Sequence, residues 1–166
     1  HPEQRDAEAR RALIVSSDPL LQGGTFMVLR KLEQDVAGFH QWASAQPELA
    51  EQMMGRKHHG EPLGDPDFAG DEQGKKCPLH SHVRRANPRT PESKRRELTR
   101  RGMSYLEKGV RRGLMFLAYN ADLGSQFEFV QRNWIARGDA ARGFREDVDP
   151  IIGRGSAASR FDVFQG

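Results

Sequence analysis

The sequence predicts an α+β fold in which antiparallel strands form one sheet and helices cover one face of it. Residues 25–32 (TFMVLRKL) are rich in strand-forming side chains that roughly alternate with polar ones, which is typical of a strand. Residues 113–119 (GLMFLAY) form a short continuous apolar run, which predicts a fully buried strand. Residues 122–137 predict an amphipathic helix, because apolar side chains recur there at helical spacing: Leu123, Phe127, Val130 and Trp134.

The other segments complete an order of strand, helix, long loop, strand and helix. Residues 1–10 are polar and predict a loop or a frayed helix. Asp35 suits the N-cap of a helix, and Pro47 suits the first turn of a second one, in which Leu49, Met53 and Met54 would face inward. Residues 55–98 are polar and rich in proline and glycine, and so long a loop is usually functional or disordered. This order predicts a ferredoxin-like antiparallel sheet.

The composition fits one domain with a local basic patch. At 166 residues the chain can bury one core, and we expect residues 1–166 to form a single domain. It carries 26 basic and 23 acidic residues, a formal net charge of +3, and most of the basic excess lies within residues 75–112. Such a patch suits an anionic ligand as well as nucleic acid. We expect no nucleic acid, because the basic segment lacks interleaved aromatic residues and any recognised binding motif.

Cysteine content and hydropathy bear on the compartment. Cys77 is the only cysteine, so no internal disulfide can form and stability does not depend on an oxidising environment. No apolar run approaches the roughly 18 residues that a membrane helix needs, and no signal peptide is visible. We therefore expect a soluble protein with no membrane partner, either cytoplasmic or exported.

The segment richest in potential ligands is residues 77–90 (CPLHSHVRRANPRT), followed by residues 99–102 (TRRG). It contains three candidate metal ligands: Cys77, His80 and His82. A closed zinc site needs four such ligands, and the chain offers no second cysteine. Two other interpretations stay open, a histidine hydrogen-bonded to loop backbone and a histidine that is an axial ligand of haem iron, for which one imidazole is sufficient.

Arginines cluster around these histidines, namely Arg84, Arg85, Arg89, Arg100 and Arg101. A solvated charged face is the ordinary explanation of such a run, but the planar guanidinium also binds carboxylates. Haem propionates are carboxylates, and a guanidinium near the metal would stabilise negative charge on a departing oxygen. One segment could therefore hold both a ligand and a charge stabiliser.

Several motifs follow one another along the chain: GTFMVLR (24–30), MGRK (54–57), GxPL (60–63), HVRRANPR (82–89), RRGxSY (100–105), GLMFxxYxxD (113–122) and QFxxxQ (126–131). In this order and at these distances they resemble the C-terminal half of the dye-decolourising (DyP-type) haem peroxidases. The resemblance runs from about residue 20 to about residue 155. A series of motifs is far more specific than any one of them.

The resemblance implies a fold, a cofactor and a set of site residues. The fold would be one half of a dimeric α+β barrel, in which residues 56–98 form a long haem-pocket loop. The cofactor would be haem b (iron protoporphyrin IX), with iron bound by the histidine directly before Val-Arg-x-Ala-Asn-Pro-Arg, which is His82 and not His80. The other implied residues are the distal arginine Arg100, which takes part in catalysis; the acidic partner of His82, which is Asp149 or alternatively Asp147; and the propionate or pocket contacts Arg84 and Arg89.

The implied activity is that of a haem-dependent peroxidase that uses hydrogen peroxide to oxidise dyes, phenolics or other one-electron donors. The family's distal Gly-x-x-Asp-Gly motif is not in this sequence, which begins His1-Pro2 as though it followed that motif. We therefore expect a second polypeptide or an N-terminal half to complete the fold and the site, and a homo-oligomer is a further option. The alternative function is a haem-binding protein without peroxidase activity.

Overall fold

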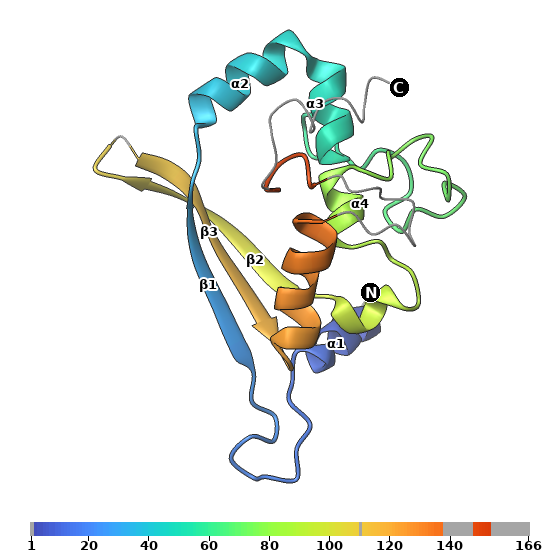
Figure 1. Ribbon diagram of the computed structural model, residues 1–166, viewed down its shortest axis with the longest axis vertical. Coiled ribbons are helices and arrows are strands. Elements are labelled where there is room, and N and C mark those ends of the chain that lie inside the picture. The colour runs from blue at the N-terminus through green and yellow to red at the C-terminus, as the bar shows by residue number, and fades with distance from the viewer. Residues whose placement is uncertain (1, 110, 138–147, 154–166) are drawn as a thin grey trace. The chain divides into compact units, whose positions relative to one another are not determined.

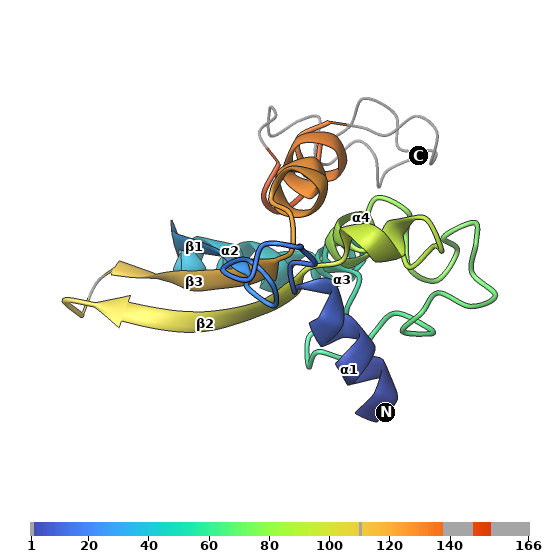
Figure 2. The same ribbon diagram turned by 90° about the horizontal axis from the view of Figure 1, so that it is seen from below.

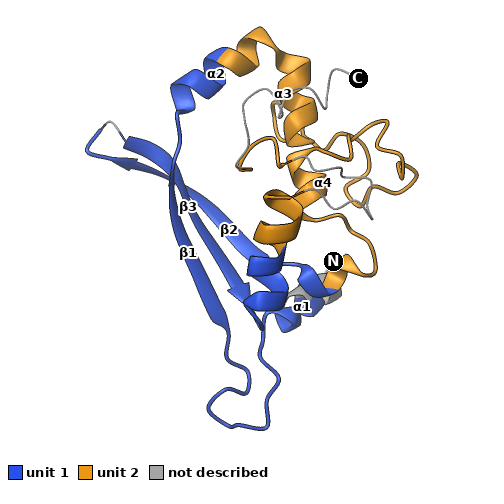
Figure 3. Ribbon diagram, viewed as in Figure 1, with its two compact units in different colours: residues 1–41, 95–129 blue, residues 42–94, 130–166 orange. Residues whose placement is uncertain are grey.

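The structure, a computed structural model, describes residues 2–109, 111–137 and 148–153. The chain divides into two compact units (Figure 3). Unit 1 comprises residues 1–41 and 95–129, and unit 2 comprises residues 42–94 and 130–166. In the described part of the chain, every helix is too short or too polar to cross a bilayer.

Unit 1 is built on a three-stranded antiparallel sheet (Figures 1 and 2). Its strands are β1 (Phe26–Glu33), β2 (Thr99–Glu107) and β3 (Arg111–Asn120), in the order β1-β3-β2. The central strand is β3, whose Leu117 pairs with Leu29 of β1 and with Arg101 of β2. The strands predicted at residues 25–32 and 113–119 are confirmed, and so is the antiparallel sheet. The expected full burial of residues 113–119 is wrong: Gly113 and Ala118 are buried, but the residues between them are half-buried and Tyr119 is exposed.

Strand β2 is absent from the elements that the sequence predicts, because its first residues are polar and follow directly on the long loop. Arg100, Arg101 and Gly102 are all exposed, and β2 shows no alternation of buried and exposed positions over its first six residues. An edge strand tolerates charged side chains and glycine, because one of its sides has no neighbouring strand to pair with. The expected arginine cluster is therefore divided between a strand of unit 1 and the segment around residues 82–89 of unit 2.

Unit 1 also contains helix α1 (Pro2–Arg11), which replaces the expected loop or frayed helix and contacts β2. Gln126, in the π-helical segment η2 (Gly124–Glu128), joins these parts. Its Oε1 accepts hydrogen bonds from the N–H groups of Ala121 and Asp122, and its Nε2 donates to the carbonyls of Arg11 and Glu97. All four hydrogen-bonding positions of the buried amide are thus used, which fixes the chain just before β2.

The predicted helices after β1 are confirmed. Asp35 precedes α2 (Val36–Ala45), and its Oδ1 accepts a hydrogen bond of 2.9 Å from the N–H of Gly38. Helix α3 (Pro47–Met54) has Pro47 in its first turn and Met53 buried, whereas Leu49 and Met54 are half-buried. The segment expected to be one long loop contains two short helices, α4 (His82–Ala86) and η1 (Ser93–Arg96). The predicted C-terminal helix consists of η2 and the π-helical η3 (Val130–Ile135).

Gly55 ends α3 and lies against the segment that carries the candidate site. It has a φ of +78°, a left-handed conformation that suits glycine at the end of a helix. A Cβ at this position would lie 2.3 Å from Val83 Cγ2 and 2.8 Å from Ser81 Oγ. Since Ser81 and Val83 flank His82, the bare backbone of Gly55 lets α3 approach α4 closely.

We expect Gly55→Ala to lower the free energy of unfolding by about 2–5 kcal/mol. Left-handed backbone costs a residue with a Cβ about 1–2 kcal/mol, and overpacking adds about 1–3 kcal/mol. Urea unfolding of the two proteins measures the difference. Gly70→Ala is the matched control, because Gly70 has a φ of +71° and nothing within 4 Å of a built Cβ. Equal losses in the two variants would show that the close approach of α3 and α4 contributes nothing.

Candidate functional site

His82 is the first residue of α4 in unit 2. Ser81 precedes it in extended conformation, so the chain enters the helix at this histidine. The His82 side chain is 24% exposed, and its Nδ1 lies 2.9 Å from Oδ2 of Asp149. No hydrogen-bond partner of Nε2 is found among the residues that the structure describes. One ring nitrogen is therefore held by a carboxylate, and the other is available.

Asp149 is fully buried, with 0% of its side chain exposed. Its Oδ1 accepts hydrogen bonds of 2.9 Å from the N–H groups of both Ile151 and Ile152, and its own N–H donates to the carbonyl of Ile135 at 2.8 Å. Burial raises the pKa of the Asp149 carboxyl, but the hydrogen bond from His82 and the two N–H groups outweigh it, so the pKa lies below its ordinary value. The alternative partner, Asp147, lies outside the described residues.

An ionised Asp149 sets the proton position on His82. A carboxylate can only accept, so Nδ1 of His82 carries the proton that lies between the two groups. In the neutral ring Nε2 then has the lone pair, which is the form in which imidazole binds a metal. The pair therefore presents a metal-binding nitrogen at the partly exposed side of His82.

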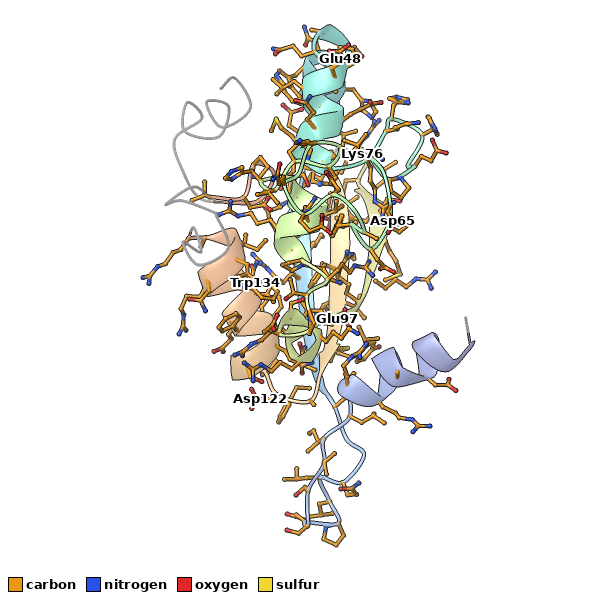
Figure 4. All side chains as sticks on the ribbon, turned by 90° about the vertical axis from the view of Figure 1, so that its right-hand side faces the viewer. Glu48, Asp65, Lys76, Glu97, Asp122 and Trp134 are labelled. Atoms are coloured by element: carbon orange, nitrogen blue, oxygen red, sulfur yellow. The ribbon has the colours of Figure 1, made fainter. Side chains whose placement is uncertain are left out.

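Arg84 belongs to a buried ion pair rather than to an open surface. Its guanidinium donates to Oδ2 of Asp71 at 3.0 Å, to the carbonyl of Asp71 at 2.5 Å and to the carbonyl of Cys77 at 2.9 Å. It also lies over the ring of Phe68, 4.7 Å from the ring centroid. These contacts join α4 to the loop that precedes it. Figure 4 shows this loop between the labelled residues Asp65 and Lys76.

Cys77 is buried, and its Sγ lies 3.3 Å from Oγ of Ser81. Burial raises the pKa of the Cys77 thiol, which disfavours the thiolate that a metal ligand must be. The described residues hold no group of three or more histidine, cysteine, aspartate or glutamate side chains arranged for a metal ion. The zinc interpretation of Cys77, His80 and His82 has no support in this part of the chain.

The remaining predicted residues lie elsewhere. Arg100 is exposed on β2 of unit 1, whereas His82 and Asp149 belong to unit 2. Arg89 follows α4 and forms an ion pair with the exposed Asp67 at 3.1 Å. The roles of Arg84, Arg89 and Arg100 stay predictions.

Two residues of this site had no assigned role in the sequence. Asp71 lies in the polar segment before the motif, where nothing local sets it apart from the acidic residues around it. Arg85 stands beside Arg84, but its partners are Trp134 in η3 and Arg137 just after it, more than forty positions along the chain. Only the tertiary fold brings these groups together.

Comparison with known proteins gives the family. The family model for Dyp-type peroxidase, C-terminal, matches residues 1–150. The multifunctional dye peroxidase DyP2 of Amycolatopsis sp. is 32% identical to this chain, over 85% of this chain and 41% of the relative. The deferrochelatase of Escherichia coli is 36% identical, over 79% of this chain and 32% of the relative.

Solved structures show the same likeness. DyP2 from Amycolatopsis sp. aligns with a TM-score of 0.71 and 26% identity, over 93% of this chain and 48% of that one. The DyP-type peroxidase of Anabaena sp. aligns with a TM-score of 0.65 and 29% identity, over 79% and 36%. The chain thus spans less than half the length of these relatives, and its α+β, ferredoxin-like fold class is confirmed. By the match to its C-terminal model, the chain belongs to the Dyp-type peroxidase family.

Proposed function

We propose that this chain is the haem-binding part of a haem-dependent peroxidase that uses hydrogen peroxide to oxidise dyes, phenolics or other one-electron donors. The observation that carries the proposal is the pair formed by His82 and the buried Asp149. Its support also includes the names of relatives, among them the dye peroxidase DyP2 and, at 26% identity, Peroxidase 2 of Mycetinis scorodonius.

The residues of unit 2 fit haem b. Haem iron needs one imidazole nitrogen with a free lone pair, and Nε2 of His82 meets this condition on a partly exposed side chain. When bound, the haem supplies the redox chemistry of peroxide reduction. Asp149 accepts the hydrogen bond from Nδ1, which orients the ring and makes the imidazole a more basic ligand.

The arginines are assigned by their surroundings. Arg100 would stabilise the negative charge that develops on a peroxide oxygen, which is the role of a fixed cation in such a site. Arg89 is the better candidate for a propionate contact, because its present partner is an exposed carboxylate. The donors of Arg84 are engaged with Asp71 and Cys77, so we assign Arg84 the positioning of α4.

The surface of unit 1 supports the need for a completing partner. Among the described residues, every exposed large hydrophobic side chain except Ile152 lies in unit 1. Four of these exposed side chains lie on one face of the sheet: Met27, Leu29, Met103 and Tyr119. The strand register places them on the same face, since residues that pair across strands share a face. An apolar face of this kind marks an interaction surface. We propose that it packs against a polypeptide that corresponds to the part of the relatives that this chain does not match.

The test is peroxide-dependent oxidation of an anthraquinone dye and of a phenol. The haem-loaded chain is assayed alone and with the completing polypeptide, and the mass of each assembly is measured. We expect turnover to rise about 10²–10⁴-fold in the complex, since this chain has no distal aspartate motif and a general acid–base group contributes about that factor. A complex that binds haem and oxidises neither donor would support the alternative, a haem-binding protein without peroxidase activity. A stable homo-oligomer that excludes the partner would overturn the proposed use of the sheet face.

We expect Asp149→Asn to weaken haem binding about 10–100-fold, the usual effect of removing a partner of a metal ligand. Oδ1 of Asp149 accepts two backbone N–H groups, so the amide oxygen would take that place and the NH₂ would face Nδ1 of His82. Nδ1 would then have to accept, and the proton would move to Nε2, where it blocks the iron. Haem titration measures the affinity, and we also expect a higher ferric/ferrous midpoint potential. Unchanged affinity and potential would show that Asp149 does not set the state of His82.

A further inference from the structure

The end of η3 is an anchor for two other segments of unit 2. The last carbonyls of a helix have no partner within the helix and need donors from elsewhere. The carbonyls of Trp134 and Arg137 accept hydrogen bonds from Nε and Nη2 of Arg85, at 2.5 and 3.0 Å. The carbonyl of Ile135 accepts the N–H of Asp149 at 2.8 Å. Trp134 is labelled in Figure 4 on this helix.

These hydrogen bonds connect His82 and Asp149 indirectly, in addition to the direct hydrogen bond between their side chains. Arg85 lies in α4, three residues after His82. Asp149 is held by its backbone to the same helix turn that binds Arg85, and its carboxylate accepts the hydrogen bond from His82. His82, Arg85, the end of η3 and Asp149 therefore form a closed loop of contacts.

The chemistry of Arg85 suits this connection. Its side chain is buried with 0% relative exposure, and a buried cation is costly unless hydrogen bonds compensate it. The carbonyls at the end of a helix carry partial negative charge, which favours a cation there. The planar guanidinium donates to two carbonyls from fixed directions, which a lysine ammonium cannot reproduce.

We propose that Arg85 is a positioning residue for the pair of His82 and Asp149. Its guanidinium ties the helix that contains His82 to the end of η3, to which the backbone of Asp149 is hydrogen-bonded, and so holds Nδ1 and Oδ2 at hydrogen-bond distance. The relevance of this role to haem rests on the proposed function, but the contacts themselves involve only residues of this chain.

The first experiment follows the Nδ1–H proton of His82 by NMR in the haem-free protein. A hydrogen bond to a buried carboxylate gives this proton a downfield, slowly exchanging signal. We expect Arg85→Met to abolish the signal and Arg85→Lys to restore part of it. Met53→Ala is the control, because it opens a cavity at a buried side chain of α3 and removes no donor or acceptor from the site. It should lower stability and leave the signal in place.

The second experiment loads the same proteins with haem. We expect Arg85→Met to bind haem about 10-fold more weakly, with the midpoint potential shifted in the same direction as in Asp149→Asn. An unchanged His82 signal in Arg85→Met, or an equal loss in Met53→Ala, would overturn the proposal. If Arg85→Met does not fold, the same criteria apply to Arg85→Lys.

The two experiments separate the proposals. A His82 signal that depends on Arg85 in a protein that binds no haem would uphold the positioning role and refute the proposed function. Haem bound through His82 with no effect of Arg85 on signal, affinity or potential would refute the positioning role alone.

Discussion

We expect the His82→Ala protein to lose its haem. Without an axial ligand from the chain, haem should separate from the protein during gel filtration, and the Soret absorption of the protein fraction should be lost. His82 presents Nε2 without a partner among the described residues, and its other nitrogen is fixed by Asp149 at 2.9 Å. One imidazole is sufficient for haem iron, so removal of this ring removes the bond on which retention depends. The measurement is the absorption spectrum of the haem-loaded protein before and after separation from free haem.

His80→Ala is the matched control, since His80 lies two residues away in the same segment. We expect this variant to keep its Soret band, because the carboxylate of Asp149 is used by His82 and by the N–H groups of Ile151 and Ile152. Added imidazole should restore a Soret band to His82→Ala, which distinguishes a missing ligand from an unfolded protein. Retention of haem by His82→Ala, or equal loss in both variants, would reject His82 as the ligand.

The parts of the fold that could be predicted are those with a strong local pattern. Strand β3 is a continuous apolar run, and α3 begins with proline, so periodicity and helix-start chemistry were sufficient. Strand β2 has neither feature. It is an edge strand with two charged residues and a glycine near its start, and such a composition is typical of a loop as well.

The residues of the candidate site also divide into those that a local motif predicts and those that no local pattern predicts. His82 and Asp149 were expected together because a family motif marks the histidine, and the structure places them in contact. The groups that support them have no such mark. Arg85 and Asp71 act through contacts with residues 49 and 13 positions away, and side-chain contacts at that separation leave no periodic trace in a single sequence.

The Asp71→Asn protein should lose about 3–5 kcal/mol of unfolding free energy, the usual effect of breaking a buried ion pair by removing one partner. Asp71 and Arg84 are 6% and 7% exposed, so water cannot replace the lost interaction. Oδ1 of Asp71 accepts the N–H of Lys76, and Oδ2 accepts the N–H of Cys77 and the guanidinium of Arg84. An amide in either orientation would point its NH₂ at one of these donors. Urea unfolding, followed by the fluorescence of Trp42 and Trp134, both of which lie in unit 2, measures the loss.

Asp67→Asn is the control for Asp71→Asn, since it removes the partner of Arg89 in a pair whose carboxylate side chain is 65% exposed. An exposed pair contributes about 0–1 kcal/mol, so a loss as large as that of Asp71→Asn would show that burial is not the cause. The double variant Asp71→Leu with Arg84→Met tests whether the loss in Asp71→Asn comes from leaving Arg84 buried without its partner. Replacing both partners by apolar side chains is often close to neutral, so it should be more stable than Asp71→Asn.

The stability that Asp71 contributes should also depend on pH. Burial raises the pKa of the Asp71 carboxyl, but the N–H groups of Cys77 and Lys76 and the charge of Arg84 outweigh it, so the folded-state pKa lies below the ordinary value. Because the folded-state pKa is lower, the Asp71 carboxyl of the unfolded chain is protonated at a higher pH than that of the folded chain as the pH falls. The contribution of Asp71 is therefore complete above the unfolded-state pKa of about 3.9 and is lost as the pH falls through the lower folded-state pKa.

The difference in unfolding free energy between the parent protein and Asp71→Asn should be constant from pH 6 to 7 and shrink below about pH 4. A difference that stays constant down to pH 3 would mean that the Asp71 carboxyl has the same pKa in the folded and the unfolded chain, so that its contacts do not favour the ionised form.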